Sequence, residues 1–502
     1  MGQTIAAYRC YRPKPFTRAE RGEVTILFGG LHWRTERLIQ GAMENLGYKS
    51  RILPTATKMD LLAGRELADI GQCCPTSFTT GNLANFLRQE AAQIGNDEVA
   101  RRYVYVTAGA CGACRFGQYH QSYELALCNT GMEAFRMFLL AQDGLDQGPA
   151  EGGGLELNLP FTMGAVWAVI VADLIQDLEY QTRPYEIKPG ATQRAVSDSV
   201  DYLQEIFRKS PIRGNKRSVP LWYLSTGYFS RALREVYSLF RQIEVDRLRV
   251  KPVVKITGEF YLQTVEGEPN YNIHQWLEQE GAEVYPAAIT IWLGYLMRLA
   301  GQDHEDHIGI NPLARLKLGA TRIGMWLLRR TYDGLRAALG DMPRELPNQY
   351  ELRKLATPYY HSRLNGGEGD MLIGKALWAY HHKKAHMICE LSPYSCMPNT
   401  MSIGAMSAVT GKYPDLLYAP LEIKGDAEVH ALSRCQMILT EAKRRAHREF
   451  GDALRENNLT PERARELLDD LPGANRATYR VPRQGMAGTA ANLVWHLAER
   501  AH

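Results

Sequence analysis

The placement of nine cysteines constrains this 502-residue chain more than any other feature. Six of them lie in three short segments, and more than half of the chain separates the second segment from the third. The segments hold Cys73 and Cys74 before a proline, Cys111 and Cys114 in a CxxC, and Cys389 with Cys396. A fold that brings these segments together would surround a group that binds thiolates, and an iron-sulfur cluster is the first candidate.

Composition and charge exclude several classes of protein. With 45% apolar and 23% charged residues, the chain is typical of a globular protein, and its length predicts two or three domains. A net charge of +4 without a long basic run argues against nucleic acid as a partner. The longest apolar run, 163–172, is too short to span a membrane. The N-terminus lacks the pattern of a secretory signal, so we expect a cytoplasmic protein with reduced thiols.

The alternation of strand and helix patterns predicts an α/β fold with two Rossmann-like domains, a site in the cleft between them, and a helical connecting region. Apolar runs that end at glycine or lead into a helical pattern mark the strands. Strands are expected at 24–28, 50–53, 103–107, 252–257, 281–284 and 416–422. The predicted regions are an α/β domain at 22–150, helices at 151–250, a second α/β domain with a helical insertion at 251–450, and an appendage at 451–502.

Zinc and thiol redox chemistry are alternatives to a cluster. The CxxC follows a predicted strand, so Cys111 and Cys114 would lie where open α/β sheets bind ligands. A structural zinc usually adds a second CxxC or a Cys-His pair nearby. A thioredoxin-like redox pair would leave Cys74 and Cys396 without a role.

Four motifs together resemble the 2-hydroxyacyl-CoA dehydratase and benzoyl-CoA reductase iron-sulfur superfamily. They are Cys74-Pro75, Gly112-Ala113-Cys114-Arg115-Phe116-Gly117, Gly258-Glu259-Phe260 and Ser392-Pro393-Tyr394-Ser395-Cys396-Met397-Pro398-Asn399. More narrowly, the chain is similar to the acyl-CoA dehydratase activase-related and double-cubane-cluster-like proteins of that group. The resemblance covers residues 24–437 and leaves the C-terminal appendage unassigned.

The resemblance implies a cofactor and its ligands. Cys74, Cys114 and Cys396 would hold one [4Fe-4S] cluster with an open iron, which is the first choice. Some relatives hold a double-cubane [8Fe-9S] cluster, for which Cys73, Cys111 and Cys389 would supply the additional thiolates. Arg115 and Gly117 follow Cys114, and the peptide N–H groups of this helix start would face the cluster sulfurs.

The resemblance also implies a function. The chain would receive low-potential electrons from an ATP-hydrolysing iron-sulfur activase, as a reductase or dehydratase component acting on an acyl-CoA or a small molecule. It carries no phosphate-binding motif of its own, and relatives pair as homodimers or heterodimers. The loop at 213–217 is a candidate for the CoA phosphates. The alternatives are a non-catalytic electron carrier or assembly factor with a double cubane, and a zinc-stabilised binding module.

Three residues are candidates for proton transfer in the cleft. His32 follows the first predicted strand, His120 follows the Cys114 loop, and Glu259 ends the strand that opens the second domain. For His32 a structural role is the main alternative. His304 with His307, and His381 and His382 with His386, have metal-compatible spacing but no accompanying ligand pattern, so we interpret them as surface residues.

Overall fold

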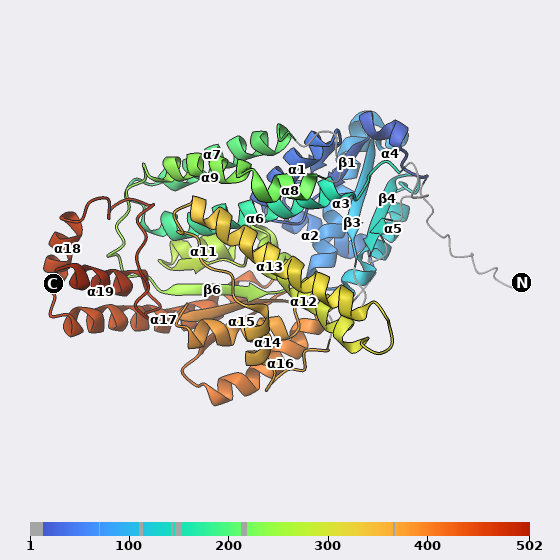
Figure 1. Ribbon diagram of the computed structural model, residues 1–502. Helices are drawn as coiled ribbons and strands as arrows, with labels where there is room; N and C mark the ends of the chain where they lie inside the picture. Colours follow the sequence, from blue (N-terminus) through green and yellow to red (C-terminus); the bar gives the residue numbers. More distant parts are fainter. Residues whose placement is uncertain are drawn as a thin grey trace, which may run out of the picture.

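Two β-sheets organise the chain, and helices cover both faces of each (Figure 1). The computed structural model describes residues 14–69, 71–109, 114–141, 144–145, 153–211, 218–364 and 367–501. Cys111 and the loop at 213–217 lie outside the described residues. The α/β class predicted from the sequence is confirmed.

The first sheet has the strand order β2-β1-β3-β4-β5, in which the first four strands are parallel and β5 is antiparallel to β4. Side chains alternate between its faces: Ile26 and Val104 pack on one side, and Leu27 and Tyr105 on the other. The strands are β1 (Thr25–Phe28), β2 (Lys49–Ile52), β3 (Tyr103–Ala108), β4 (Arg136–Ala141) and β5 (Gly144–Leu145). Its helices are η1 (Arg18–Gly22), α1 (Trp33–Asn45), α2 (Lys58–Leu67), α3 (Cys74–Ile94), α4 (Asn96–Arg102), η2 (Arg115–Gln118) and α5 (Tyr119–Asn129).

The second sheet is entirely parallel, with the order β7-β6-β8-β9. It repeats the order of the first four strands of the first sheet, since in both the first strand in the chain lies between the second and the third. Its strands are β6 (Val253–Gly258), β7 (Glu283–Tyr285), β8 (Met387–Pro393) and β9 (Leu417–Ile423). Its helices are α10 (Phe260–Thr264), η4 (Glu268–Asn270), α11 (Ile273–Gln279), α14 (Gln349–Ala356), α15 (Asp370–His381), α16 (Met397–Lys412) and α17 (Glu428–Glu456).

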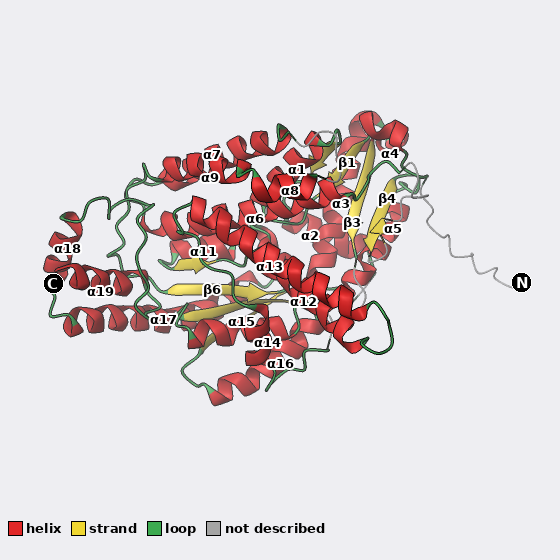
Figure 2. Ribbon diagram, viewed as in Figure 1, coloured by secondary structure: helices red, strands yellow, loops and turns green. Residues whose placement is uncertain are grey.

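A layer of helices joins the two sheets (Figure 2). Its core forms where α6 and α7 pack on α1 and on the neighbouring α9 and α13. The elements are α6 (Leu159–Thr182), η3 (Arg183–Tyr185), α7 (Ala191–Arg208), α8 (Val219–Ser225), α9 (Tyr228–Phe240), α12 (Ile289–Asp306) and α13 (Ala314–Ala338). The segment Leu159–Tyr185 is long and apolar enough to cross a membrane, but 67% of its most apolar window is buried inside the protein, the pattern of a core helix.

The C-terminal segment packs on the second sheet unit and is not a separate body. Helix α17 runs through residue 450, the predicted boundary, and α19 (Thr489–Ala501) packs against it, with α18 (Pro461–Asp469) beside α19. Their apolar faces form a small core that includes Leu248 from the segment before β6. The segment therefore contributes side chains to the amino-terminal end of the second sheet.

Candidate functional site

In the described residues, each of the three cysteine segments contains the start of a helix. Cys73 is the N-cap of α3, and Cys74 is its first residue. Cys114 is the N-cap of η2, which leads into α5, and Cys396 is the N-cap of α16. Because the N-terminus of a helix carries a partial positive charge, it stabilises thiolates and other anions.

Proline and local hydrogen bonds explain why helices begin at these cysteines. The first turns of α3 and α16 contain Pro75 and Pro398, and proline is favoured there because its fixed φ suits a helix and its missing N–H would be unpaired anyway. At Cys114 the backbone N–H of Phe116 donates to the sulfur at 3.4 Å. This bond fixes the Cys114 side chain at the start of the turn; that the N–H groups of the turn face cluster sulfurs stays a prediction.

Glu259 lies among the cysteines. It is the N-cap of α10, and its carboxylate accepts hydrogen bonds from the N–H groups of Tyr261 and Leu262 at 3.1 and 3.0 Å. Its position depends on Gly258, which has a φ of +128° and whose Cβ, if present, would lie 2.2 Å from the carbonyl oxygen of Leu391 in β8. Only glycine fits there, so the glycine sets the turn that places Glu259.

The charge of Glu259 acts on the thiols of four cysteines. Burial, with a smaller contribution from the negative charge of Glu259, raises the pKa of Cys74 and of Cys114 to about 12. The same two causes raise the pKa of Cys73 and of Cys396. The fold thus brings Cys73, Cys74, Cys114 and Cys396 together from both sheet units; we call them the four site cysteines. Without a cationic partner such as a metal ion, these thiols stay protonated.

The adjacent residues Cys73 and Cys74 face different parts of the protein. Cys73 packs in the core of the first sheet, with its sulfur 3.1 Å from the Thr76 hydroxyl and 3.3 Å from the Tyr119 hydroxyl. Cys74 packs against the core of the second sheet unit. The two thiols therefore lie on opposite sides of the start of α3, and Cys74 is the one directed toward the second unit.

Cys389 lies apart from the four site cysteines. It is fully buried in the middle of β8, and its thiol is hydrogen-bonded to that of Cys435 on α17. Cys396 follows the end of the same strand, and its sulfur lies 3.4 Å from the side-chain oxygen of Asn399. The structure thus brings together four of the described cysteines that the sequence suggested as ligands and leaves Cys389 in the core.

A buried network of charged side chains extends from Glu259 into the second unit. Burial raises the pKa of Glu368, and the charge of Glu259 raises it further, whereas burial lowers the pKa of Lys375. Gln263 joins the two, donating to Glu368 at 3.4 Å and accepting from Lys375 at 3.1 Å. Beyond them, Glu390 accepts from Asn399 at 3.2 Å. This network could hold and release protons near neutral pH.

Sequence reasoning did not single out Glu368, Lys375 or Glu390. Glu368 lies in a glycine-rich turn before α15, Lys375 on an otherwise apolar helix, and Glu390 within a buried strand. A charged residue inside an apolar helix or strand is the one signal that could have identified the last two, since burial of an unpaired charge is costly.

The remaining predicted residues have different environments. His32 is fully buried as the N-cap of α1, with its Nε2 3.5 Å from Asp173, a position that favours the structural role. His120 is partly exposed on α5, and its Nδ1 has no hydrogen-bond partner among the described residues. Arg115 and Gly117 are partly exposed in the turn after Cys114.

Within the described part of the chain, no three His, Cys, Asp or Glu side chains lie close enough to hold a single metal ion. The ligands of a cluster are spaced more widely, because each thiolate binds a different iron. No protein-family model matches this chain, and no curated protein matches it.

Proposed function

We propose that this chain holds a [4Fe-4S] cluster on Cys74, Cys114 and Cys396, and that it receives low-potential electrons from an ATP-hydrolysing iron-sulfur partner. The reduction would act on an acyl-CoA or another small molecule. One observation carries the proposal: three segments far apart in the sequence each place a cysteine at a helix N-terminus around Glu259.

The donor set fits such a cluster. Cys74 and Cys396 are buried and Cys114 is partly exposed, so the site limits the access of water, and the helix N-termini supply positive potential for an anionic group. The cluster, when bound, would supply one-electron transfer at a potential that thiolates, nearby N–H groups and burial adjust. The chain's own residues would set these conditions.

The repeated strand order supports the finer proposal of two Rossmann-like domains. Glu259 follows β6, Cys114 follows β3 and Cys396 follows β8, so these residues lie beyond the carboxyl ends of parallel strands from both sheets. Open α/β sheets bind ligands at this edge. A Cβ added to Gly30, just after β1, would lie 3.8 Å from the ring of Tyr261, just after β6, so the two edges meet.

In this proposal Glu259, Glu368 and Lys375 exchange the protons that accompany electron transfer. Burial moves the pKa of each toward neutrality, and the charge of Glu259 adds to the rise at Glu368. Groups that titrate near the working pH are the best proton donors and acceptors.

The test compares cysteine-to-serine variants after anaerobic purification. Cys74→Ser, Cys114→Ser and Cys396→Ser should each lose most of the bound iron and acid-labile sulfide. Cys128→Ser is the control: Cys128 lies near the end of α5, the helix that follows the Cys114 turn, and this variant should keep both. Iron retained in all three ligand variants would contradict the assignment. Loss of a second set of irons in Cys73→Ser would favour the double-cubane electron carrier, and zinc in place of iron and sulfide would favour the binding module.

A further inference from the structure

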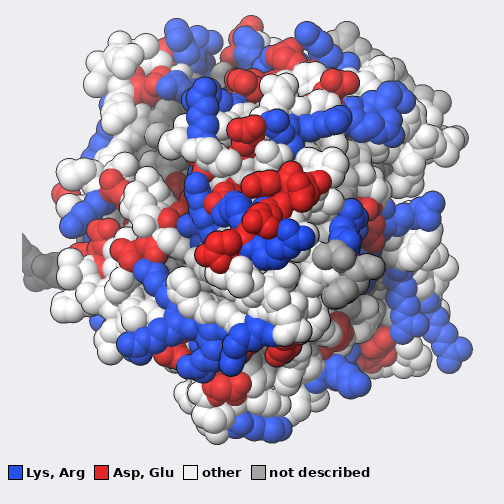
Figure 3. Space-filling model, turned by 90° about the vertical axis from the view of Figure 1, so that its left-hand side faces the viewer, with Lys and Arg blue, Asp and Glu red and all other residues white. Residues whose placement is uncertain are grey.

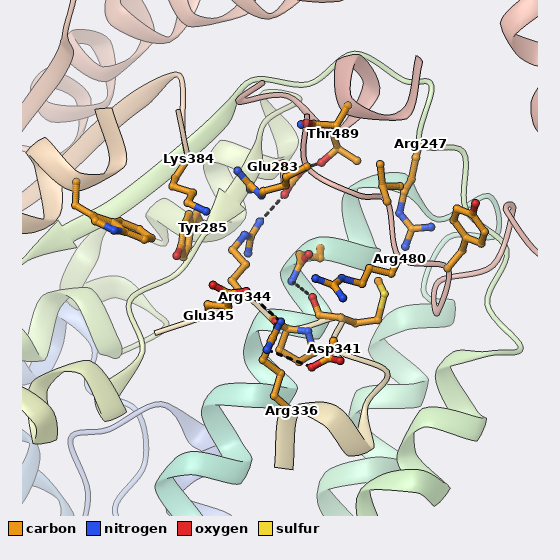
Figure 4. Close-up of a pocket in the computed structure, with 18 residues that line it drawn as sticks. Arg247, Glu283, Tyr285, Arg336, Asp341, Arg344, Glu345, Lys384, Arg480 and Thr489 are labelled. Carbon is orange, nitrogen blue, oxygen red and sulfur yellow. Dashed lines mark hydrogen bonds and ion pairs between the residues drawn. The ribbon is translucent and has the colours of Figure 1, made fainter. Parts of the chain in front are cut away.

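A pocket of about 230 Å³ lies at the amino-terminal end of the second sheet. Its walls come mainly from β7, from the end of α13 and the segment after it, from the segments before β6 and β8 that hold Arg247 and Lys384, and from the C-terminal segment around Arg480 and Thr489 (Figure 4). Glu259 and Cys396 follow the carboxyl ends of β6 and β8, and at ~3.3 Å per residue β6 separates the two ends by about 20 Å. The pocket is therefore separate from the site of the four cysteines.

The lining of this pocket is cationic. It contains six Lys and Arg side chains and three carboxylates. Two of the arginines have carboxylate partners: Arg344 with Asp177 and Glu283, and Arg336 with Asp341 and Glu345. The other four cations, which we call the unpaired cations, have no carboxylate within ion-pair distance in the described part of the chain; they are Arg247, Lys384, Arg480 and Arg483.

Arg247 anchors the inner wall. It is 3% exposed, and its two terminal nitrogens donate to the carbonyl oxygens of Arg476 and Ala477 at 2.9 and 2.7 Å. Among the described residues this buried guanidinium donates only to neutral carbonyl groups, and burial lowers its pKa to about 10. In Figure 4 the guanidinium groups of Arg247, Arg344 and Arg480 approach the same space from three different segments.

Neighbouring arginines destabilise the charge of two of the unpaired cations. Burial lowers the pKa of Lys384, and the charges of Arg483 and Arg344 lower it further. Burial and the charge of Arg344 lower the pKa of Arg483 in the same way. An anion bound among these groups would relieve both effects.

The positive excess is local. Figure 3 shows the face at the α18 and α19 end of the molecule, where Lys and Arg side chains lie beside Asp and Glu over most of the surface. A broad basic surface would attract any polyanion, whereas a small pocket with converging guanidinium groups selects by shape.

We propose that this pocket binds the diphosphate group of a small phosphorylated ligand. Arginine forks match phosphate oxygens in geometry and charge, and lysine adds a point charge at the rim. The volume is below the ~300 Å³ at which pockets usually enclose a whole ligand, so the pocket would take the phosphates and leave the rest of the ligand outside. The C-terminal segment, which the sequence left without a role, would complete the site through Arg480, Arg483 and Thr489.

Isothermal titration calorimetry of the full-length protein with inorganic pyrophosphate tests this proposal, at an ionic strength held constant with sodium chloride. We expect one binding event per chain, and weaker binding of orthophosphate. Arg480→Gln and Lys384→Gln should each weaken pyrophosphate binding by about tenfold or more, since each removes a charged hydrogen-bond donor.

Arg463→Gln is the matched control, because Arg463 lies in the same C-terminal segment but pairs with Glu466 on the surface of α18. It should bind pyrophosphate as the unmodified protein does. Three results would overturn the proposal: no binding at millimolar pyrophosphate, tighter binding of orthophosphate, or equal loss of affinity in the control and in the pocket variants. The readout is independent of bound iron.

Discussion

Several residues in and around the site are both buried and ionisable. The pKa of such a group depends on single neighbouring residues. Glu259 is placed by Gly258 and raises the pKa of all four site cysteines. Such groups make stability depend on pH wherever the folded protein changes their proton affinity. His274, away from these cysteines, offers a clear case for measurement.

His274 on α11 should make the protein less stable as the pH falls below 6.5. Burial lowers the pKa of His274 from 6.5 to about 4, and its two ring nitrogens have no hydrogen-bond partners within the described chain. The unfolded chain therefore binds a proton between pH 6.5 and 4 that the folded protein does not. This shift costs about 3 kcal/mol of unfolding free energy across that interval, and none above it.

Urea denaturation of the unmodified protein and of His274→Gln, at several pH values, measures this contribution. The difference in unfolding free energy between the two proteins should change across the interval and stay constant above pH 6.5, the ordinary value for His274. A constant difference at every pH would show that the histidine does not carry the effect.

At the scale of elements, the start of α3 is held by close contact with α2. A Cβ on Gly64 would lie 1.8 Å from the carbonyl oxygen of Ser77, and one on Gly81 would lie 1.8 Å from that of Asp60. The two helices therefore touch backbone to backbone. This contact fixes the end of α3 that carries Cys73 and Cys74.

Gly81→Ala should separate α2 from α3 and lower the unfolding free energy by roughly 2–4 kcal/mol, the range of strongly disruptive core changes. Thermal denaturation would measure the effect. Gly334→Ala is the control, because a Cβ there meets no atom within 4 Å on helix α13, and it should stabilise the protein by up to about 1 kcal/mol. Equal melting temperatures of the two variants would contradict the close contact.

A second junction between elements depends on Asp173 of α6. Its carboxylate accepts from the N–H groups of Ile289 and Thr290, at the start of α12, at 3.0 and 2.7 Å, and it lies beside the His32 ring. Asp173→Ala should cost about 2–4 kcal/mol, because it leaves a helix N-terminus and a buried histidine without their partner. Asp201→Ala removes a surface ion pair with Arg37 and should change the melting temperature little. Equal losses of stability in the two variants would contradict the role of Asp173 between α6 and α12.

The sequence predicts some of these elements well and others poorly. Strands β1, β3 and β6 are short apolar runs that end at or near glycine, and the structure has them within two residues of the expected limits. Strand β4 was not expected, since a short apolar run such as 136–141 cannot be told from a helical segment by its pattern alone. The sequence pattern predicts a helix over 82–94, whereas α3 begins at Cys74: Pro75 starts the helix, and Thr76 and Ser77 belong to it although such residues often form turns.

The candidate site, too, could be predicted from the sequence only in part. Cysteine placement and the Gly258-Glu259 turn could be read from the chain, whereas the burial of Glu368 and Lys375 and the pairing of Cys389 with Cys435 depend on how distant segments pack. The cationic pocket could not be predicted either, since its side chains come from six separate segments.

At the scale of the whole molecule, the cysteine site and the cationic pocket lie at opposite ends of the second sheet. Cys114 and Cys396 follow the carboxyl ends of strands from the two units, Cys73 and Cys74 lie at the start of α3, and the amino-terminal end of the second sheet carries the cationic pocket. The helical layer of α6, α7, α9 and α13 holds the two units together through a shared core. The proposed cluster would add a further link between them.

The central claim is most directly tested by iron and acid-labile sulfide per chain after anaerobic purification, with an electron paramagnetic resonance spectrum of the dithionite-reduced protein. The account predicts about four irons with matching sulfide and the signal of a reduced cubane cluster. A colourless protein with stoichiometric zinc and neither iron nor sulfide would contradict it.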